Sequence, residues 1–111
     1  MKTGIELIAE ERAAQVTREG WTAEHDDKHD AGELASAAAC YTVHASCQIH
    51  PYDGNGIEDI GTVPWWPWDR SWWKPKDPIR NLVRAGALIA AEIDRLQRKQ
   101  SSEGGDLWTE S

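Results

Sequence analysis

Two sets of side chains that together suit a nucleotide lie almost side by side in the sequence. Five of the seven tryptophans fall between residues 65 and 73, and five cations lie between residues 70 and 84 with Asp77 as the opposing carboxylate. An exposed indole stacks a nucleobase at about 1–3 kcal/mol per base, and cations beside a helix start attract phosphate. The pattern predicts a small nucleotide-like, phosphate-bearing ligand. The ligand-binding candidates are Trp21, Trp68, Arg70, Trp72, Trp73, Lys74, Lys76, Arg80 and Arg84.

Each half of that pattern also has a structural interpretation. The chain has no phenylalanine, so about three of the five clustered tryptophans are expected to seal the core, which leaves one or two for a ligand. The alternative for the cations is pairing with the acidic segment 24–33, which would hold the domain together.

A second cluster mixes carboxylates with imidazoles. The segment Glu24–Asp30 reads E-H-D-D-K-H-D, and Glu33 follows one helical turn beyond it. Hard Mg²⁺ or Ca²⁺ would take the oxygens, whereas a transition metal would take the imidazoles. The alternative is a solvated segment whose last aspartate caps a helix. The metal-binding candidates are His25, Asp26, Asp27, His29 and Glu33.

Carboxylates on the outer helices offer another route to metal chemistry. If two helices present them toward one groove, they would hold Mg²⁺ against a pyrophosphate, although carboxylates on helix exteriors are usually only solvated. The sequence contains no nucleophile motif and no glycine-rich phosphate loop. The candidates for this hydrolytic alternative are Glu10, Glu33, Glu92 and Asp94.

Three helices are expected to position these groups. The first begins near Gly4, because Thr3 and Glu6 have the spacing of a capping box, and it stops at Gly20. Residues 21–30 are polar and are expected to form a loop. Asp30 and Glu33 repeat the capping spacing, so a second helix is expected over residues 31–46. Its predicted buried face contains Leu34, Ala37, Ala38, Tyr41 and Ala45.

The third helix is expected to begin where Asp77 caps Pro78, and to fade near Lys99. Between the second and third helices, residues 48–76 are rich in proline, glycine and tryptophan and have no helical periodicity. We therefore expect a mainly all-α, three-helix single domain over residues 1–100 with a long Trp/Pro-rich loop, followed by a flexible tail over 101–111. The predicted buried face of the third helix is Ile79, Leu82, Val83, Gly86, Ile89, Ala90, Ile93 and Leu96.

Composition narrows the classes of function. The 111 residues carry a net charge of −7 with a sequence pI near 5.0, so direct binding of bulk nucleic acid is not expected, although an acidic inhibitor or interaction module stays open. No apolar run approaches the ~20 residues that cross a bilayer, and no signal core is evident near Met1. A cytoplasmic location without membrane contact is expected. Homo-oligomer formation is left open.

The two cysteines are expected to remain reduced. Cys40 and Cys47 fall on the second predicted helix, seven residues apart, which separates them by roughly 10 Å along its axis. A disulfide needs Cα atoms within about 7 Å. Both are therefore expected to act as small core residues.

Two longer stretches resemble a family of small phage and prophage proteins without an assigned activity. They are G-W-T with D-D-K-H over residues 20–29, and W-W-K-P-K-D with G-A-L-I over residues 72–89. The resemblance spans most of residues 5–98. The resemblance itself implies no activity. Together with the predicted ligand site, it leads to the hypothesis of a phage accessory or counter-defence protein that sequesters a signalling nucleotide.

Two further resemblances imply different activities. Gly20-Trp21-Thr22 followed by Asp26-Asp27 is similar to the ryanodine-receptor repeat domain, a helical family whose prokaryotic members are suspected of nucleotide binding. Gly32-Glu33-Leu34-Ala35 is similar to the G-E-L-A run of the MazG-type all-α nucleotide pyrophosphohydrolases, which hold Mg²⁺ on paired acidic motifs. The chain lacks the E-x-x-D partner motif of that second family.

Overall fold

The protein is mainly α-helical, as predicted, and a computed structural model describes residues 1–50 and 65–102. The described helices are α1 (Gly4–Thr17), α2 (Ala23–Asp27), α3 (Glu33–Ile49) and α4 (Pro78–Ser102), and a 3₁₀ turn, η2, spans Arg70–Trp72. Part of the predicted Trp/Pro-rich loop and most of the predicted tail lie outside the described residues. None of the described helices is long and apolar enough to cross a bilayer.

The start of α1 follows the predicted capping box. The backbone N–H of Glu6 donates to Thr3 Oγ1 at 3.2 Å, and the backbone N–H of Thr3 donates to Glu6 Oε1 at 2.7 Å. These two bonds satisfy N–H groups that have no partner within the helix. The helix ends at Thr17, and Gly20 then adopts a positive φ of 73°, which only glycine adopts without strain.

The segment expected to be a loop over residues 21–30 contains α2, so this prediction is wrong. Thr22 caps α2, since its hydroxyl accepts from the backbone N–H of His25 at 3.3 Å. The predicted Asp30 cap of α3 is also wrong. Gly32, at φ 82°, occupies the N-cap, and the Glu33 carboxylate accepts from the backbone N–H of Ala31 at 2.7 Å. A short helix and a glycine cap thus replace the expected loop and aspartate cap.

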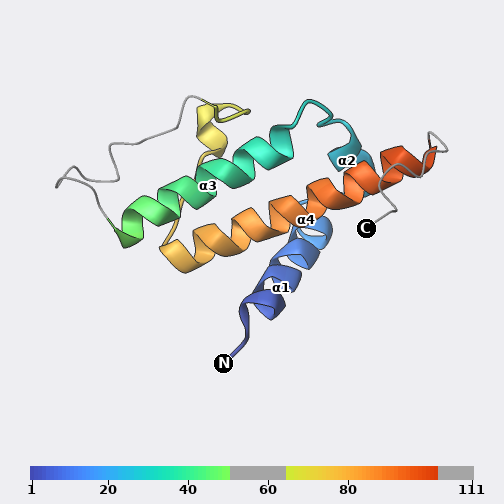
Figure 1. Cartoon of the computed structure of the whole chain (residues 1–111). Coiled ribbons are helices and arrows are strands. Elements are labelled where there is room, and N and C mark those ends of the chain that lie inside the picture. The colour runs from blue at the N-terminus through green and yellow to red at the C-terminus, as the bar shows by residue number, and fades with distance from the viewer. Residues whose placement is uncertain (51–64, 103–111) are drawn as a thin grey trace.

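The core lies between α3 and α4, which run side by side in opposite directions (Figure 1). The predicted buried face of α3 is confirmed, because all five of its residues are buried. Four of those five are small or flat side chains, so α4 approaches α3 closely. Trp21, Trp66, Trp68 and Trp73 pack against the edge of this core and are partly buried.

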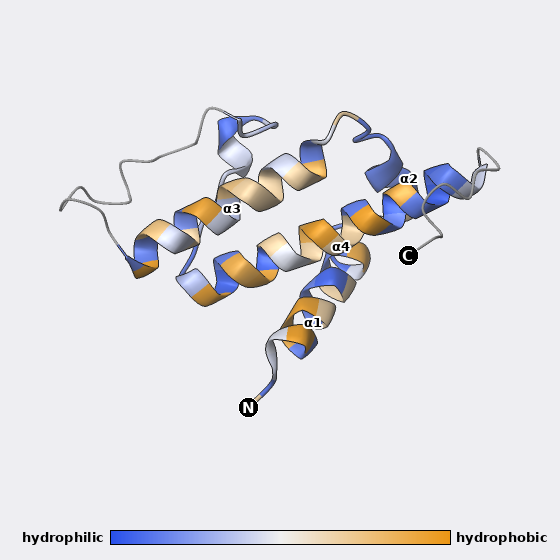
Figure 2. Ribbon diagram, viewed as in Figure 1, coloured by the Kyte–Doolittle hydropathy of each residue, from blue (hydrophilic) through white to orange (hydrophobic). Residues whose placement is uncertain are grey.

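The predicted buried face of α4 is wrong for most of its residues. The helix begins as expected, since the backbone N–H of Arg80 donates to Asp77 Oδ1 at 2.9 Å. The residues that face the core, here called the inner face, are Ala85, Leu88 and Ala91. Large apolar residues on another side of the helix are exposed. Figure 2 shows the apolar colouring that recurs along α4. This outer stripe consists of Ile79, Leu82, Ile89, Ile93 and Leu96.

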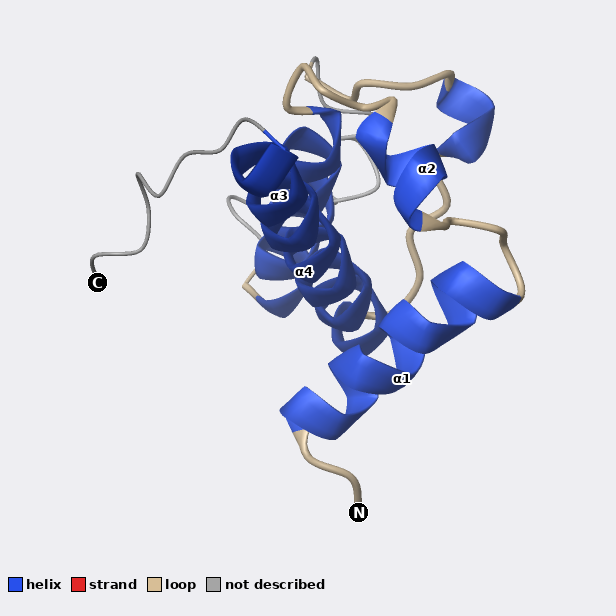
Figure 3. Ribbon diagram, turned by 90° about the vertical axis from the view of Figure 1, so that its right-hand side faces the viewer, coloured by secondary structure: helices blue, strands red, loops and turns tan. Residues whose placement is uncertain are grey.

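Helix α1 crosses α4 at an angle and packs mainly against that helix (Figure 3). The contact is close at Gly86, where an added Cβ would lie 2.5 Å from Ile8 Cδ1. The buried residues of α1 are polar, namely Glu11 and Gln15. Glu11 meets α4 through an ion pair with Arg80, at 2.6 Å. The α1–α4 contact therefore combines one apolar crossing point with a partly buried ion pair.

The segment that carries the tryptophans is held to the ends of α3 and α4 by one buried amide. Asn81 is 1% exposed, and its Nδ2 donates to Gln48 Oε1 and to the Lys76 carbonyl, each at 2.9 Å. Its Oδ1 accepts from the backbone N–H of Lys76 at 2.8 Å. Because Asn81 uses both ends of its amide, residue 76 is fixed beside both helices.

Both cysteines are free, as predicted. Cys40 is buried and Cys47 is half-buried. Burial raises the pKa of the Cys40 thiol to about 11, so this side chain stays protonated and unreactive near neutral pH.

Candidate functional site

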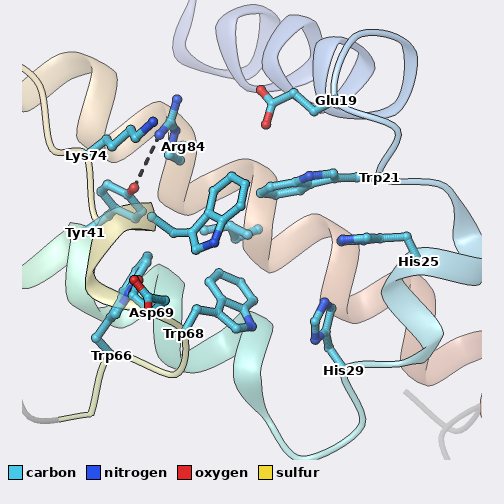
Figure 4. A pocket seen from close by; sticks show the side chains of 12 residues that line it. Glu19, Trp21, His25, His29, Tyr41, Trp66, Trp68, Asp69, Lys74 and Arg84 are labelled. Carbon is cyan, nitrogen blue, oxygen red and sulfur yellow. Dashed lines mark hydrogen bonds between the residues drawn. The ribbon is translucent and has the colours of Figure 1, made fainter.

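A pocket of about 520 Å³ lies between the tryptophan segment, the α1–α2 connection and the middle of α4 (Figure 4). That volume is within the range of small-molecule and cofactor sites. Aromatic side chains make most of its wall, and charged groups lie at its edge. The lining residues are Glu19, Trp21, His25, His29, Tyr41, Trp66, Trp68, Asp69, Trp72, Lys74, Arg84 and Leu88.

The aromatic wall is a continuous series of ring contacts. Ring centroids are 5.7 Å apart for Tyr41 and Trp66, and 5.4 Å apart for Trp66 and Trp68. Trp68 meets His29 at 5.3 Å, and His29 meets His25 at 4.9 Å. These pairs have the edge-to-face geometry that aromatic rings prefer. They leave flat apolar surface turned toward the pocket.

Local hydrogen bonds set the shape of the tryptophan segment. Asp69 caps η2, because its Oδ1 accepts from the backbone N–H of Ser71 at 2.9 Å. That bond holds the pKa of the Asp69 carboxyl below its ordinary value. The Asp69 carbonyl accepts from Trp66 Nε1 at 3.1 Å. A short capped turn thus returns the chain so that Trp66 and Trp72 both reach the pocket.

The tryptophans divide between core and pocket. Trp73 packs into the core edge, with ring centroids 4.8 Å from Tyr41 and 4.9 Å from Trp66, and it does not line the pocket. Trp21 and Trp68 serve both regions, since they pack against the core and line the pocket. Trp72 lines the pocket and is 64% exposed, so its indole is the one most available to a ligand.

Two of the five predicted cations line the pocket. Lys74 Nζ lies 5.9 Å from the ring centroid of Trp72. Arg84 donates to the Tyr41 hydroxyl at 3.3 Å and lies over the Tyr41 ring at 5.5 Å. Burial disfavours the charged form of Arg84, but Tyr41, Glu11 and Glu19 outweigh it and raise the guanidinium pKa above its ordinary value. Arg84 is therefore a fixed positive charge at the pocket wall.

The other three predicted cations lie outside the pocket. Arg70 and Lys76 are exposed, and Arg80 is paired with Glu11 of α1. The alternative prediction, in which the cations of residues 70–84 pair with the acidic segment 24–33, is wrong. Asp26 pairs with Arg12 at 2.8 Å. Asp27 pairs with Arg98, also at 2.8 Å, so the acidic segment takes its cations from α1 and the end of α4.

The five predicted metal-binding residues do not converge on one point. Among the described residues, no three His, Cys, Asp or Glu side chains are grouped so that they could hold a metal ion. The reason is that the carboxylates have other partners: Asp26 and Asp27 take the arginines just named, and Glu33 lies 3.7 Å from His29 Nδ1. The two imidazoles turn to the pocket instead. The residues concerned are His25, Asp26, Asp27, His29 and Glu33.

The carboxylates of the hydrolytic alternative are equally dispersed. Glu10 of α1 pairs with Lys2, which precedes that helix, and Glu92 pairs with Arg95 on α4 at 2.7 Å. Glu33 stands at the start of α3 beside His29. Burial raises the Glu33 carboxyl pKa, but hydrogen bonds from backbone N–H groups and the nearby His29 lower it more. Asp94 is exposed and joins no metal-binding group within the described part of the chain.

Sequence reasoning missed five of the lining residues. Tyr41 was expected only in the core, and Leu88 was not expected at either place. Trp66 belongs to the tryptophan cluster but was not among the chosen candidates, and Glu19 and Asp69 carry no local signal of a binding role. Glu19 reaches the pocket because Gly20 turns the chain immediately after it. Comparisons of the chain with protein-family models, with curated proteins and with solved structures find no match. The geometry of the pocket is therefore the basis for assigning a function.

Proposed function

We propose that this protein is a non-catalytic binder of a small ligand that joins an aromatic base to a phosphate group. The observation that carries the proposal is the composition of the pocket wall. Indole and imidazole rings line most of it, and Lys74 and Arg84 stand together on one side (Figure 4). Following the phage-type resemblance, its role would be to sequester a signalling nucleotide.

Two indoles of the pocket wall are already fixed in place and favour a stacked base. Trp21 and Trp68 have one side against the core and the other against the pocket, so their positions are set before a ligand arrives. Trp72 belongs to the short turn η2 and is largely exposed. A flat ring that enters the pocket would gain contact with fixed indoles and would cover Trp72, and each such stack is worth about 1–3 kcal/mol.

Two cations on one side of the pocket favour a phosphate group. Arg84 is already charged and partly desolvated, and Lys74 adds an exposed ammonium on the same side. A phosphate there would accept charge-assisted hydrogen bonds, which are roughly twice as strong as neutral ones. Glu19 and Asp69 also line the pocket, so the site favours one compact phosphate over an extended polyanion.

The test is a titration with AMP, adenosine and inorganic phosphate, followed by calorimetry and by tryptophan fluorescence. We expect AMP to bind more tightly than either fragment. Trp72→Ala should weaken AMP and adenosine alike by about 5- to 150-fold, which is the loss of one stacked base. Lys74→Ala should weaken AMP and leave adenosine unchanged, because only the phosphate meets that ammonium.

The chain offers a matched control for each variant. Trp65 is exposed and does not line the pocket, so Trp65→Ala should leave AMP binding unchanged. Lys76 is likewise exposed outside the pocket, so Lys76→Ala should have no effect beyond a small change in salt dependence. Absence of binding by mono-, di- and cyclic nucleotides at millimolar concentration would contradict the proposed function.

A further inference from the structure

A buried carboxylate lies directly behind the imidazole side of the pocket. Asp26 is 0% exposed, although it belongs to the short surface helix α2. Its Oδ2 accepts from Arg12 at 2.8 Å, and its Oδ1 lies 3.0 Å from His25 Nδ1. One oxygen therefore holds the guanidinium of α1, and the other holds the ring that lines the pocket.

This contact fixes which nitrogen of His25 carries the proton. A carboxylate only accepts hydrogen bonds, so Nδ1 must be the donor in the bond to Asp26. In the neutral imidazole, Nε2 is then an acceptor. The His25 ring is also held in plane, because it stacks on Trp21 with 10° between the rings and 5.4 Å between their centroids. His25 therefore presents a fixed acceptor toward the pocket.

His25 Nε2 lies on the side of the pocket where the base of the ligand is expected. His25 and His29 lie on the opposite side of the pocket from Lys74 and Arg84 (Figure 4). If phosphate occupies the cationic side, the base lies at the imidazole side, between Trp21 and Trp68. The edge of the base then faces His25.

We propose that His25 selects the base: its Nε2 accepts a hydrogen bond from an exocyclic amino group, so the pocket prefers amino-bearing bases to their keto counterparts. This inference rests on the proposed function and names the class of ligand within it. Adenine carries an amino group where hypoxanthine carries a carbonyl oxygen. An oxygen facing Nε2 would set two acceptors against each other, and a base that covers Nε2 without donating to it would leave that nitrogen unpaired.

The experiment compares AMP with IMP, and CMP with UMP, by calorimetry. We expect the amino-bearing member of each pair to bind about tenfold more tightly, the loss expected for one unpaired buried acceptor. His25→Phe keeps a flat ring for stacking on Trp21 but removes the acceptor. It should bring the ratio of AMP affinity to IMP affinity close to one, because AMP loses its hydrogen bond and IMP no longer meets an opposing acceptor.

Two further variants separate selection from a general structural role. His29→Phe alters the neighbouring imidazole and should keep the preference for AMP. Asp26→Asn acts through His25 as a change at a positioning residue: the amide can donate to Nδ1, which frees the ring to carry its proton on Nε2. The ratio of AMP affinity to IMP affinity should then fall below that of the unmodified protein. If Asp26→Asn does not fold, His25→Phe decides the question.

The outcomes distinguish this inference from the function on which it rests. Equal binding of AMP and IMP, or a ratio that survives in His25→Phe, overturns the inference and leaves the proposed function in place. A ratio lost in His29→Phe but kept in His25→Phe also overturns it, because the reading group would then be the other histidine. Failure of every nucleotide to bind removes both.

Discussion

The two apolar sides of α4 have opposite surroundings. The inner face presents small side chains and Leu88 to α3, and these residues are almost fully buried. The outer stripe presents five larger apolar side chains, each at least 43% exposed. Side-chain size therefore does not decide which side of this helix is buried. The alanine-rich face of α3 accepts a partner with an equally low profile, and the aromatic rings fill the space beside it.

The largest effect is expected on the inner face. Leu88 is 1% exposed and also forms part of the pocket wall. Leu88→Ala should lower the free energy of unfolding by about 2–5 kcal/mol, because it removes buried methyl groups and leaves a cavity. Urea unfolding followed by circular dichroism would measure this. A loss below about 0.5 kcal/mol would mean that the inner face is not the principal core of α4.

An intermediate effect is expected where α1 crosses α4. Gly86→Ala places a methyl group 2.5 Å from Ile8 Cδ1. Overpacking costs about 1–3 kcal/mol, and replacing a helical glycine returns about 0.5–1 kcal/mol, so the net result should be a loss of about 1 kcal/mol.

The control for Gly86→Ala is the double variant in which Ile8→Ala removes the side chain that the added methyl group would meet. With Ile8 shortened, the added methyl group meets no obstacle, so Gly86→Ala should stabilise the double variant relative to Ile8→Ala alone. A double-mutant cycle measures this change of sign. Additive effects in the cycle would show that Ile8 and Gly86 are not in contact in solution.

The smallest effect is expected on the outer stripe. Ile89 is 48% exposed, and Ile89→Ala should change the free energy of unfolding by no more than about 0.5 kcal/mol. Measurements at two protein concentrations would sharpen the comparison with Leu88→Ala. A large loss that grows with protein concentration would contradict a free outer stripe and would show that another molecule covers it.

Features set by neighbouring residues were predictable from the sequence. The starts of α1 and α4 depend on Thr3, Glu6 and Asp77, each of which meets its backbone partner within one turn. The buried face of α3 was predictable because that helix has a single apolar stripe. Helix α4 has two, and periodicity alone does not rank them. The α3 cap was misjudged because Gly32 competes with the D-x-x-E spacing that begins at Asp30.

The types of side chain at the site were predictable from the sequence, but the full set of lining residues was not. Trp21, Trp68, Trp72, Lys74 and Arg84 were expected at a ligand, and the structure brings all five to one pocket. Local sequence patterns did not predict the ion pairs between residues that lie far apart in the chain. Arg80 meets a carboxylate 69 positions earlier in the chain, which removes it from the site. The two pocket histidines were assigned to a metal, since nothing in their spacing shows that Asp26 turns inward to Arg12.

The bond from Arg12 to Asp26 gives the amino-terminal helix a part in a pocket it does not touch. Every lining residue stands at position 19 or later, so a shortened chain that begins at Arg18 would keep the entire wall. It would nevertheless leave the buried Asp26 carboxylate beside His25 without its arginine partner. That unpaired charge would draw water into the interior. Helix α1 thus supplies the positive charge that neutralises Asp26, and its removal would disturb α2 and His25 first.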